Sequence, residues 1–137
     1  MKRQALFLVV PLLMAAFAVA AAPKPTPDSP KGPKLAHMVF FTLKERTKEA
    51  RASMVAHCQK YLSGHEGVLY FSVGTIAEDV VEPVSDRDFD VALHLVFDSK
   101  ESELKYIDAP RHKEFVEGGK GMWSRVRVFD TYLSDAK

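Results

Sequence analysis

Alternation of apolar and polar residues predicts four β-strands in this 137-residue chain. In the strand at 89–98 every second residue from Phe89 to Phe97 is apolar, which gives the clearest one-sided pattern. In the strand at 36–43 both faces are largely apolar, which is typical of a central strand covered on both sides. The predicted strands cover positions 36–43, 68–76, 89–98 and 125–133.

Apolar residues recur at helical spacing between positions 47 and 63, and this region is predicted to be a helix. A second helical region begins after Ser99, whose side chain we expect to cap it. Proline lacks an N–H group and disfavours helix in the residue before it, so Pro110 should break this region. A further helical turn should then carry His112 and Phe115.

The predicted order is strand, helix, strand, strand, helix, strand. This βαββαβ order is typical of an α+β, ferredoxin-like fold, in which the helices cover one face of a four-stranded antiparallel sheet. Because several strands are apolar on both faces, the uncovered face needs a partner. We therefore expect a homodimer in which two sheets pack face to face around a two-fold axis.

The N-terminus has the pattern of a signal peptide: Lys2 and Arg3, an apolar run, and small residues suited to cleavage. An uncleaved membrane anchor is the alternative, but the run is barely long enough to span a bilayer and Pro11 interrupts it. We expect export to the periplasm or beyond, with no stable membrane insertion after cleavage. The predicted organisation is a signal peptide at 1–22, a proline-rich linker at 23–34, a folded domain at 35–133 and a tail at 134–137.

Charge and cysteine content exclude several classes of function. The net charge is +1, and basic residues are scattered among acids, so the sequence carries no footprint for nucleic acid. Cys58 is the only cysteine, which excludes an intrachain disulfide and a multi-thiolate metal site. Its helical spacing from Met54 predicts a small buried apolar residue. The five histidines show no recognised ligand spacing, so we predict no metal and no cofactor, although a folded-state cluster of His37, His94 and His112 stays open.

The break at Pro110 holds the main candidate chemistry. It sets Tyr106 and His112 on either side of an irregular joint, where both polar tips could face one cavity. The alternative interpretation is that the two side chains only pad the joint, since structural pairs outnumber functional ones. His37 is a third candidate, because it shares the apolar face of the first strand, where a buried structural histidine is the alternative.

These residues carry a family resemblance. Four segments resemble the stress-responsive dimeric α/β-barrel (Dabb) domain family across 35–133, and the resemblance implies a ferredoxin-like monomer that pairs into a dimeric α/β barrel. In most of that family it implies no established chemistry. The segments are Ala36–Leu43, Asp90–Leu93 leading into Phe97–Ser99, the run Tyr106-x-x-x-Pro110-x-His112-x-x-Phe115, and Val128–Asp130.

The resemblance leaves three expectations for function. The first is an exported barrel protein of unestablished activity that binds a small apolar ligand. The second follows from similarity to the olivetolic-acid-cyclase-like branch and implies a cofactor-independent cyclase, isomerase or lyase. There His112 would be the general base, Tyr106 would hold a carbonyl group and His37 would orient or share protons. The third is a monooxygenase-like barrel enzyme acting without a dedicated metal.

Overall fold

The computed structural model describes residues 32–134. The predicted signal peptide, almost all of the predicted linker and most of the predicted tail lie outside these residues. The elements are β1 (Leu35–Leu43), α1 (Lys48–Leu62), β2 (Val68–Thr75), β3 (Val91–Phe97), α2 (Lys100–Asp108), α3 (Pro110–Gly119) and β4 (Trp123–Tyr132). Within 32–134 no helix combines the length and apolar character that crossing a membrane requires.

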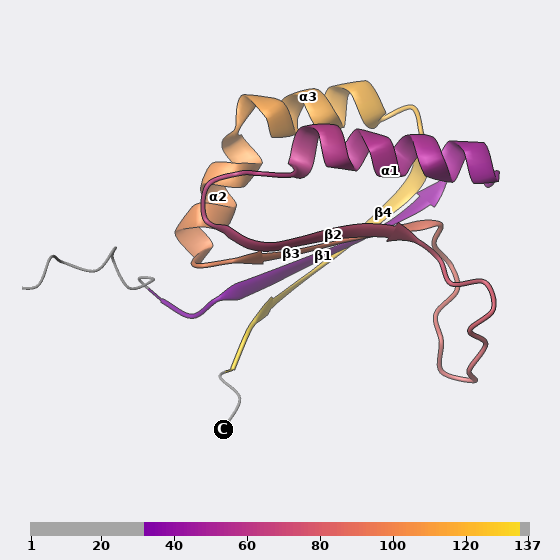
Figure 1. The fold of residues 1–137 in the computed structure, drawn as a ribbon, viewed down its shortest axis with the longest axis horizontal. Coiled ribbons are helices and arrows are strands. Elements are labelled where there is room, and N and C mark those ends of the chain that lie inside the picture. Colours follow the sequence, from indigo (N-terminus) through magenta and orange to yellow (C-terminus); the bar gives the residue numbers. More distant parts are fainter. Residues whose placement is uncertain (1–31, 135–137) are drawn as a thin grey trace, which may run out of the picture.

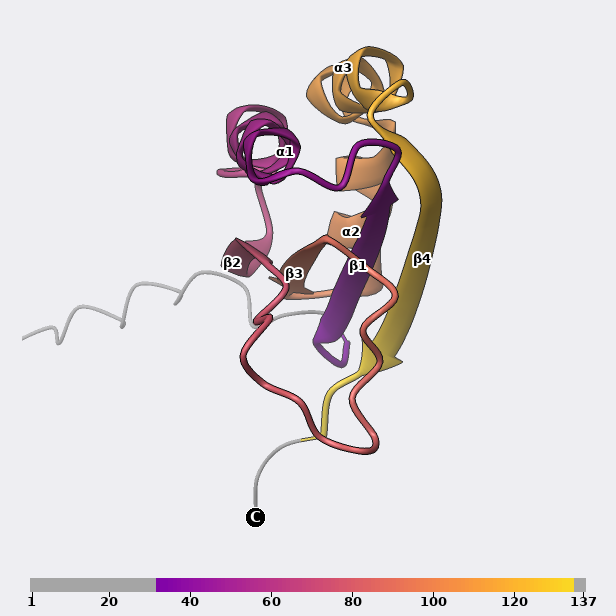
Figure 2. The same cartoon turned by 90° about the vertical axis from the view of Figure 1, so that its right-hand side faces the viewer.

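The four strands form one antiparallel sheet in the order β2-β3-β1-β4. All three helices lie on the same side of it, and the opposite face is left open (Figures 1 and 2). This arrangement confirms the predicted ferredoxin-like fold. The expected break is also present: Ala109 adopts an extended conformation and separates α2 from α3, and Pro110 is the first residue of α3.

The core lies between the helices and the helix-facing side of the sheet. Alternate residues of β3, from Val91 to Phe97, are almost completely buried there, as their one-sided pattern predicts. From α1, Met54 and Cys58 are fully buried against them. Burial raises the pKa of the Cys58 thiol to about 12, so this cysteine is an inert packing residue.

The largest differences from the predicted sheet are at the starts of two strands, and the other strand bounds differ by at most one residue. β3 begins at Val91 instead of position 89, because the preceding Asp90 is drawn into a buried ionic cluster. β4 begins at Trp123, earlier than predicted, because an irregularity between Thr42 and Leu43 lets Trp123 pair with β1.

The ionic cluster is built on the fully buried carboxylate of Asp90. The backbone N–H of Leu43 donates to it at 2.9 Å, and the guanidinium groups of Arg46 and Arg51 contact it at 3.0 Å. Burial alone would raise the pKa of Asp90, but these three donors outweigh burial and lower it. The cluster ties the start of β3 to the end of β1 and to α1.

Gly67 lets β2 leave the loop after α1, and its replacement by alanine is expected to destabilise the fold. Its φ is +79°, and a Cβ atom there would collide with the side chain of Ser102. We expect Gly67→Ala to lower the free energy of unfolding by about 1–3 kcal/mol from the collision, besides the backbone strain. Urea unfolding measures the loss. Gly64→Ala is the matched control, because Gly64 has φ +68° but open space at its Cβ; an equal loss in both variants would contradict the collision.

Candidate functional site

A cavity of about 340 Å³ lies between the helix-facing side of β1 and β4 and the helices α2 and α3. The break between those helices opens this space, because α3 leaves in a new direction after Ala109. Three polar side chains face the cavity: His37, Tyr106 and His112. All three candidates from the sequence therefore lie around one space. The apolar walls include Val39, Ile107, Phe115, Trp123, Val126 and Val128.

Tyr106 and His112 meet across the helix break. Their ring centroids are 4.8 Å apart in an edge-on arrangement, and His65 contacts Tyr106 from another side with a ring separation of 4.9 Å. Tyr106 is almost fully buried, and burial, more than nearby charge, raises the pKa of its phenol. Tyr106 therefore stays protonated at neutral pH and can donate a hydrogen bond.

His37 is held by an acid that the sequence analysis did not select. The antiparallel register places His37 of β1 directly opposite Asp130 of β4, and His37 Nδ1 lies 2.6 Å from Asp130 Oδ1. Since a carboxylate accepts hydrogen bonds, this pairing assigns the proton to Nδ1 and leaves Nε2 as an acceptor. A histidine oriented by a carboxylate is an arrangement suited to proton transfer.

His112 is also suited to accept a proton. Burial, reinforced by repulsion from His37 and His65 when those rings are protonated, lowers its pKa below the ordinary value of 6.5. The imidazole of His112 is therefore neutral at pH 7. A neutral imidazole next to a protonated phenol provides a base and a hydrogen-bond donor within the same cavity.

Glu103 lies close to His37 and Asp130, although it does not line the cavity itself. It lies one helical turn before Tyr106, and its carboxylate, Asp130 and His37 each offer a ligand atom within 4.8 Å of the others. Burial, more than any nearby charge, raises the pKa of Glu103. One nitrogen and two carboxylates are ligand types that can hold a divalent cation. Sequence spacing gave no sign of this set, because its members come from β1, α2 and β4.

The other three histidines do not line the cavity. His94 faces the open side of the sheet beside Phe40, so the cluster of His37, His94 and His112 that spacing left open does not form. His57 is half-buried and bonds through Nε2 to the Phe115 carbonyl at 2.9 Å. His65 bonds in the same way to the Tyr61 carbonyl at 2.8 Å.

Comparison with known proteins identifies the family and the fold. A Dabb family protein from Mesorhizobium loti matches with a TM-score of 0.63 and 21% identity, covering 76% of this chain and 100% of that one. A hydroxynitrile lyase from Passiflora edulis matches with a TM-score of 0.61 and 18% identity, covering 77% and 97%. A dimeric ferredoxin-like protein of unknown function from Thermobifida fusca matches with a TM-score of 0.62 and 14% identity, covering 75% and 93%.

At these identities the structural matches establish the fold alone. A search of curated proteins found no match. The family model for the stress responsive A/B barrel domain matches residues 35–133, which is the whole of the sheet and its helices. This chain therefore belongs to the stress responsive A/B barrel (Dabb) domain family.

Proposed function

We propose that this protein binds a small, largely apolar ligand in the cavity beside the broken helix. The observation that carries this proposal is the 340 Å³ space with apolar walls and three polar tips, those of His37, Tyr106 and His112. Apolar walls supply affinity by removing ligand surface from water, and a few polar groups set the orientation. The ligand class is a compact apolar body that carries one carbonyl or hydroxyl group.

The protein acts, in this proposal, as a homodimer formed through the open faces of two sheets. The open face carries exposed or half-exposed apolar side chains, including Met38, Phe40 and Phe129. A lone sheet face of this kind is costly in water, and a second copy can cover it. The relative from Thermobifida fusca is described as dimeric, which supports the same assembly.

Export is the second part of the proposal, and it rests on the sequence of residues 1–22. Expression of the full chain in a bacterium, followed by N-terminal sequencing of the product, tests it. The expected result is a product that starts near residue 23 and appears outside the cytoplasm. An intact N-terminus with the protein retained in the cytoplasm would contradict export.

A second candidate function is cofactor-independent proton transfer of the lyase, isomerase or cyclase type. The 2.6 Å contact between His37 and Asp130 favours it, together with the lowered pKa of His112. His112 would remove a proton from a C–H or O–H bond, and Tyr106 would donate to the oxygen where charge develops. His37, oriented by Asp130, would supply or receive the second proton.

Cleavage of an aromatic cyanohydrin is a suitable probe of this second candidate. The base would remove the hydroxyl proton, the bond to the nitrile carbon would break, and cyanide would leave as the carbonyl forms. A relative named as a hydroxynitrile lyase motivates the choice of probe. Oxygen uptake with phenols, without proton-transfer activity, would support the monooxygenase-like alternative instead.

Blocking the cavity is expected to abolish ligand binding. Val128 lines the cavity from β4, and Val128→Trp would place an indole ring in the space. We expect the affinity for the neutral fluorescent probe N-phenyl-1-naphthylamine to fall by at least about tenfold. Fluorescence titration measures the change. Leu69→Trp on exposed β2 is the control, and equal affinity in the two variants and the parent would overturn the assigned site.

A further inference from the structure

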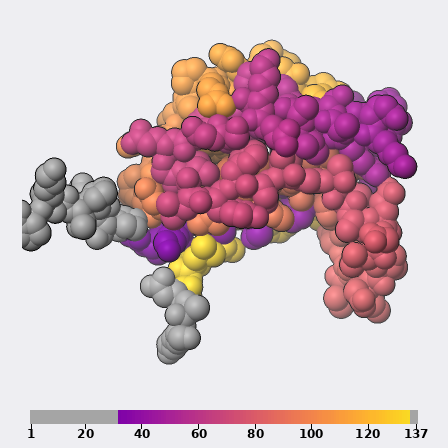
Figure 3. Space-filling view, in the orientation of Figure 1, coloured from indigo at the N-terminus to yellow at the C-terminus, as the bar shows by residue number. Residues whose placement is uncertain are grey.

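The connection between β2 and β3 is long and extends away from the helices. It spans residues 76–90, and we call it the arm. It projects beyond the open face of the sheet (Figures 1 and 2) and forms a separate lobe in the space-filling view (Figure 3). Connections of this length without secondary structure are uncommon in small domains and usually serve a function.

The arm is fastened to the open face of the sheet. The guanidinium of Arg127 on β4 contacts Asp86 at 2.5 Å, and that of Arg125 contacts Asp88 at 2.8 Å. From β1, the hydroxyl of Thr42 donates to the Asp88 carbonyl at 2.9 Å. These three contacts, made by two neighbouring strands, hold the base of the arm in a fixed position beside the open face.

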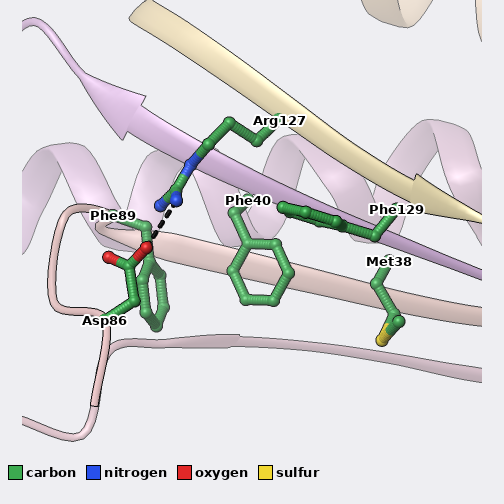
Figure 4. A pocket seen from close by; sticks show the side chains of 6 residues that line it. All are labelled: Met38, Phe40, Asp86, Phe89, Arg127 and Phe129. Carbon is green, nitrogen blue, oxygen red and sulfur yellow. Dashed lines mark hydrogen bonds and ion pairs between the residues drawn. The ribbon is translucent and has the colours of Figure 1, made fainter. Parts of the chain in front are cut away.

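A recess of about 290 Å³ lies between the arm and the sheet (Figure 4). Aromatic rings form most of it: the Phe40 ring lies 5.1 Å from that of Phe89 and 5.8 Å from that of Phe129. Asp86 and Arg127 neutralise each other at one end, so the recess offers apolar surface without net charge. The residues around it are Met38, Phe40, Asp86, Phe89, Arg127 and Phe129.

The far part of the arm exposes apolar side chains. Val81 is 68% exposed and Val84 is 94% exposed. Both belong to the arm, whose base is fixed by ion pairs and which projects on the side of the open face (Figures 1 and 2). Exposed apolar side chains on a segment that borders an unpartnered apolar face indicate a contact surface.

We propose that the arm is a clasp between two copies of this chain. In a face-to-face pair, the open faces of the two sheets pack together. The arm of each copy then lies along the side of the other copy, and Val81 and Val84 are its contact residues. The recess receives an apolar side chain of the partner. The occupant is a second copy because the recess has no net charge to select a charged partner, and because a relative with this fold is dimeric. This inference rests on the homodimer in the proposed function.

Analytical ultracentrifugation over a dilution series tests the clasp. We expect the double variant Val81→Ser/Val84→Ser to raise the dimer dissociation constant by at least about tenfold. Leu104→Ser is the matched control, because Leu104 is an exposed leucine on α2 in the helical layer, and it should leave the constant unchanged. Circular dichroism confirms that the variants are folded.

A single introduced thiol gives an independent readout. Cys58 is buried and its pKa is raised to about 12, so in Val84→Cys only the new cysteine should react with a maleimide. We expect slower labelling at concentrations where the protein is dimeric than at high dilution. A dimer with an unchanged dissociation constant in the double variant, or with equal labelling rates, would overturn the clasp alone. A chain that stays monomeric at every concentration would overturn the homodimer as well.

Discussion

Asp90→Ala is expected to lower the free energy of unfolding by about 3–5 kcal/mol. The change removes a fully buried carboxylate that is shared by Arg46, Arg51 and the N–H of Leu43. The Leu43 N–H would then be buried without its acceptor, and the largely buried Arg51 would keep only its contact with Glu78. Since a domain of this size is stable by only about 5–15 kcal/mol, this loss would be a large fraction of its total stability.

Urea unfolding monitored by circular dichroism measures this loss. Asp90→Asn should recover part of it, because the amide oxygen can still accept from Leu43. Asp108→Asn is the control: its carboxylate is exposed and paired only with exposed Lys113, so a change below about 1 kcal/mol is expected. Similar losses from Asp90→Asn and Asp108→Asn would show that the buried cluster contributes no more than a surface pair.

The same carboxylate makes stability depend on pH. Because the pKa of Asp90 is lowered in the folded state, the unfolded chain binds its proton first as pH falls. The stabilisation from Asp90 is therefore present well above its ordinary value of 3.8 and is lost as pH falls below that value. The difference in unfolding free energy between the parent and Asp90→Asn should shrink over this acidic range.

His112→Ala is expected to reduce the turnover of any proton-transfer substrate by about 10²–10⁴-fold, which is the usual contribution of a general base. Because His112 is only half-buried beside Tyr106, we expect His112→Ala to stay folded, so that the loss of turnover reflects the missing base. Cyanide release from an aromatic cyanohydrin measures turnover, and thermal unfolding monitors the fold. Lys113→Ala, an exposed neighbour on the same helix, is the control.

The pH profile distinguishes a base from a structural histidine. Because the pKa of His112 lies below 6.5, kcat/KM of the parent should decrease only as the pH drops below that value, where His112 becomes protonated. The residual activity of His112→Ala should not show this decrease. A parent protein that binds the apolar probe but turns over no substrate would leave ligand binding as the function. Unchanged turnover in His112→Ala would remove His112 from the chemistry.

Residue types in the sequence identified part of the candidate site but not all of it. A tyrosine and a histidine around Pro110 marked the break, and the structure has both rings at the cavity. Asp130 was passed over although it alternates onto the same face of β4 as Val126 and Val128. An acidic residue within an apolar strand face could have marked Asp130 as a candidate. Its role as the partner of a histidine, however, depends on which residue lies opposite it in the sheet.

The sequence by itself determined the strands, the helices, the break at Pro110 and the one-sided coverage of the sheet. These features follow from periodicity and from the missing N–H of proline, which are local properties of the chain. The tertiary structure alone decided that His37 lies opposite Asp130, 93 positions away in the sequence, and that Asp90 is buried between two arginines. The local apolar pattern fixes which face a side chain takes, but which residue of a distant strand lies opposite it depends on how the strands pair in the folded sheet.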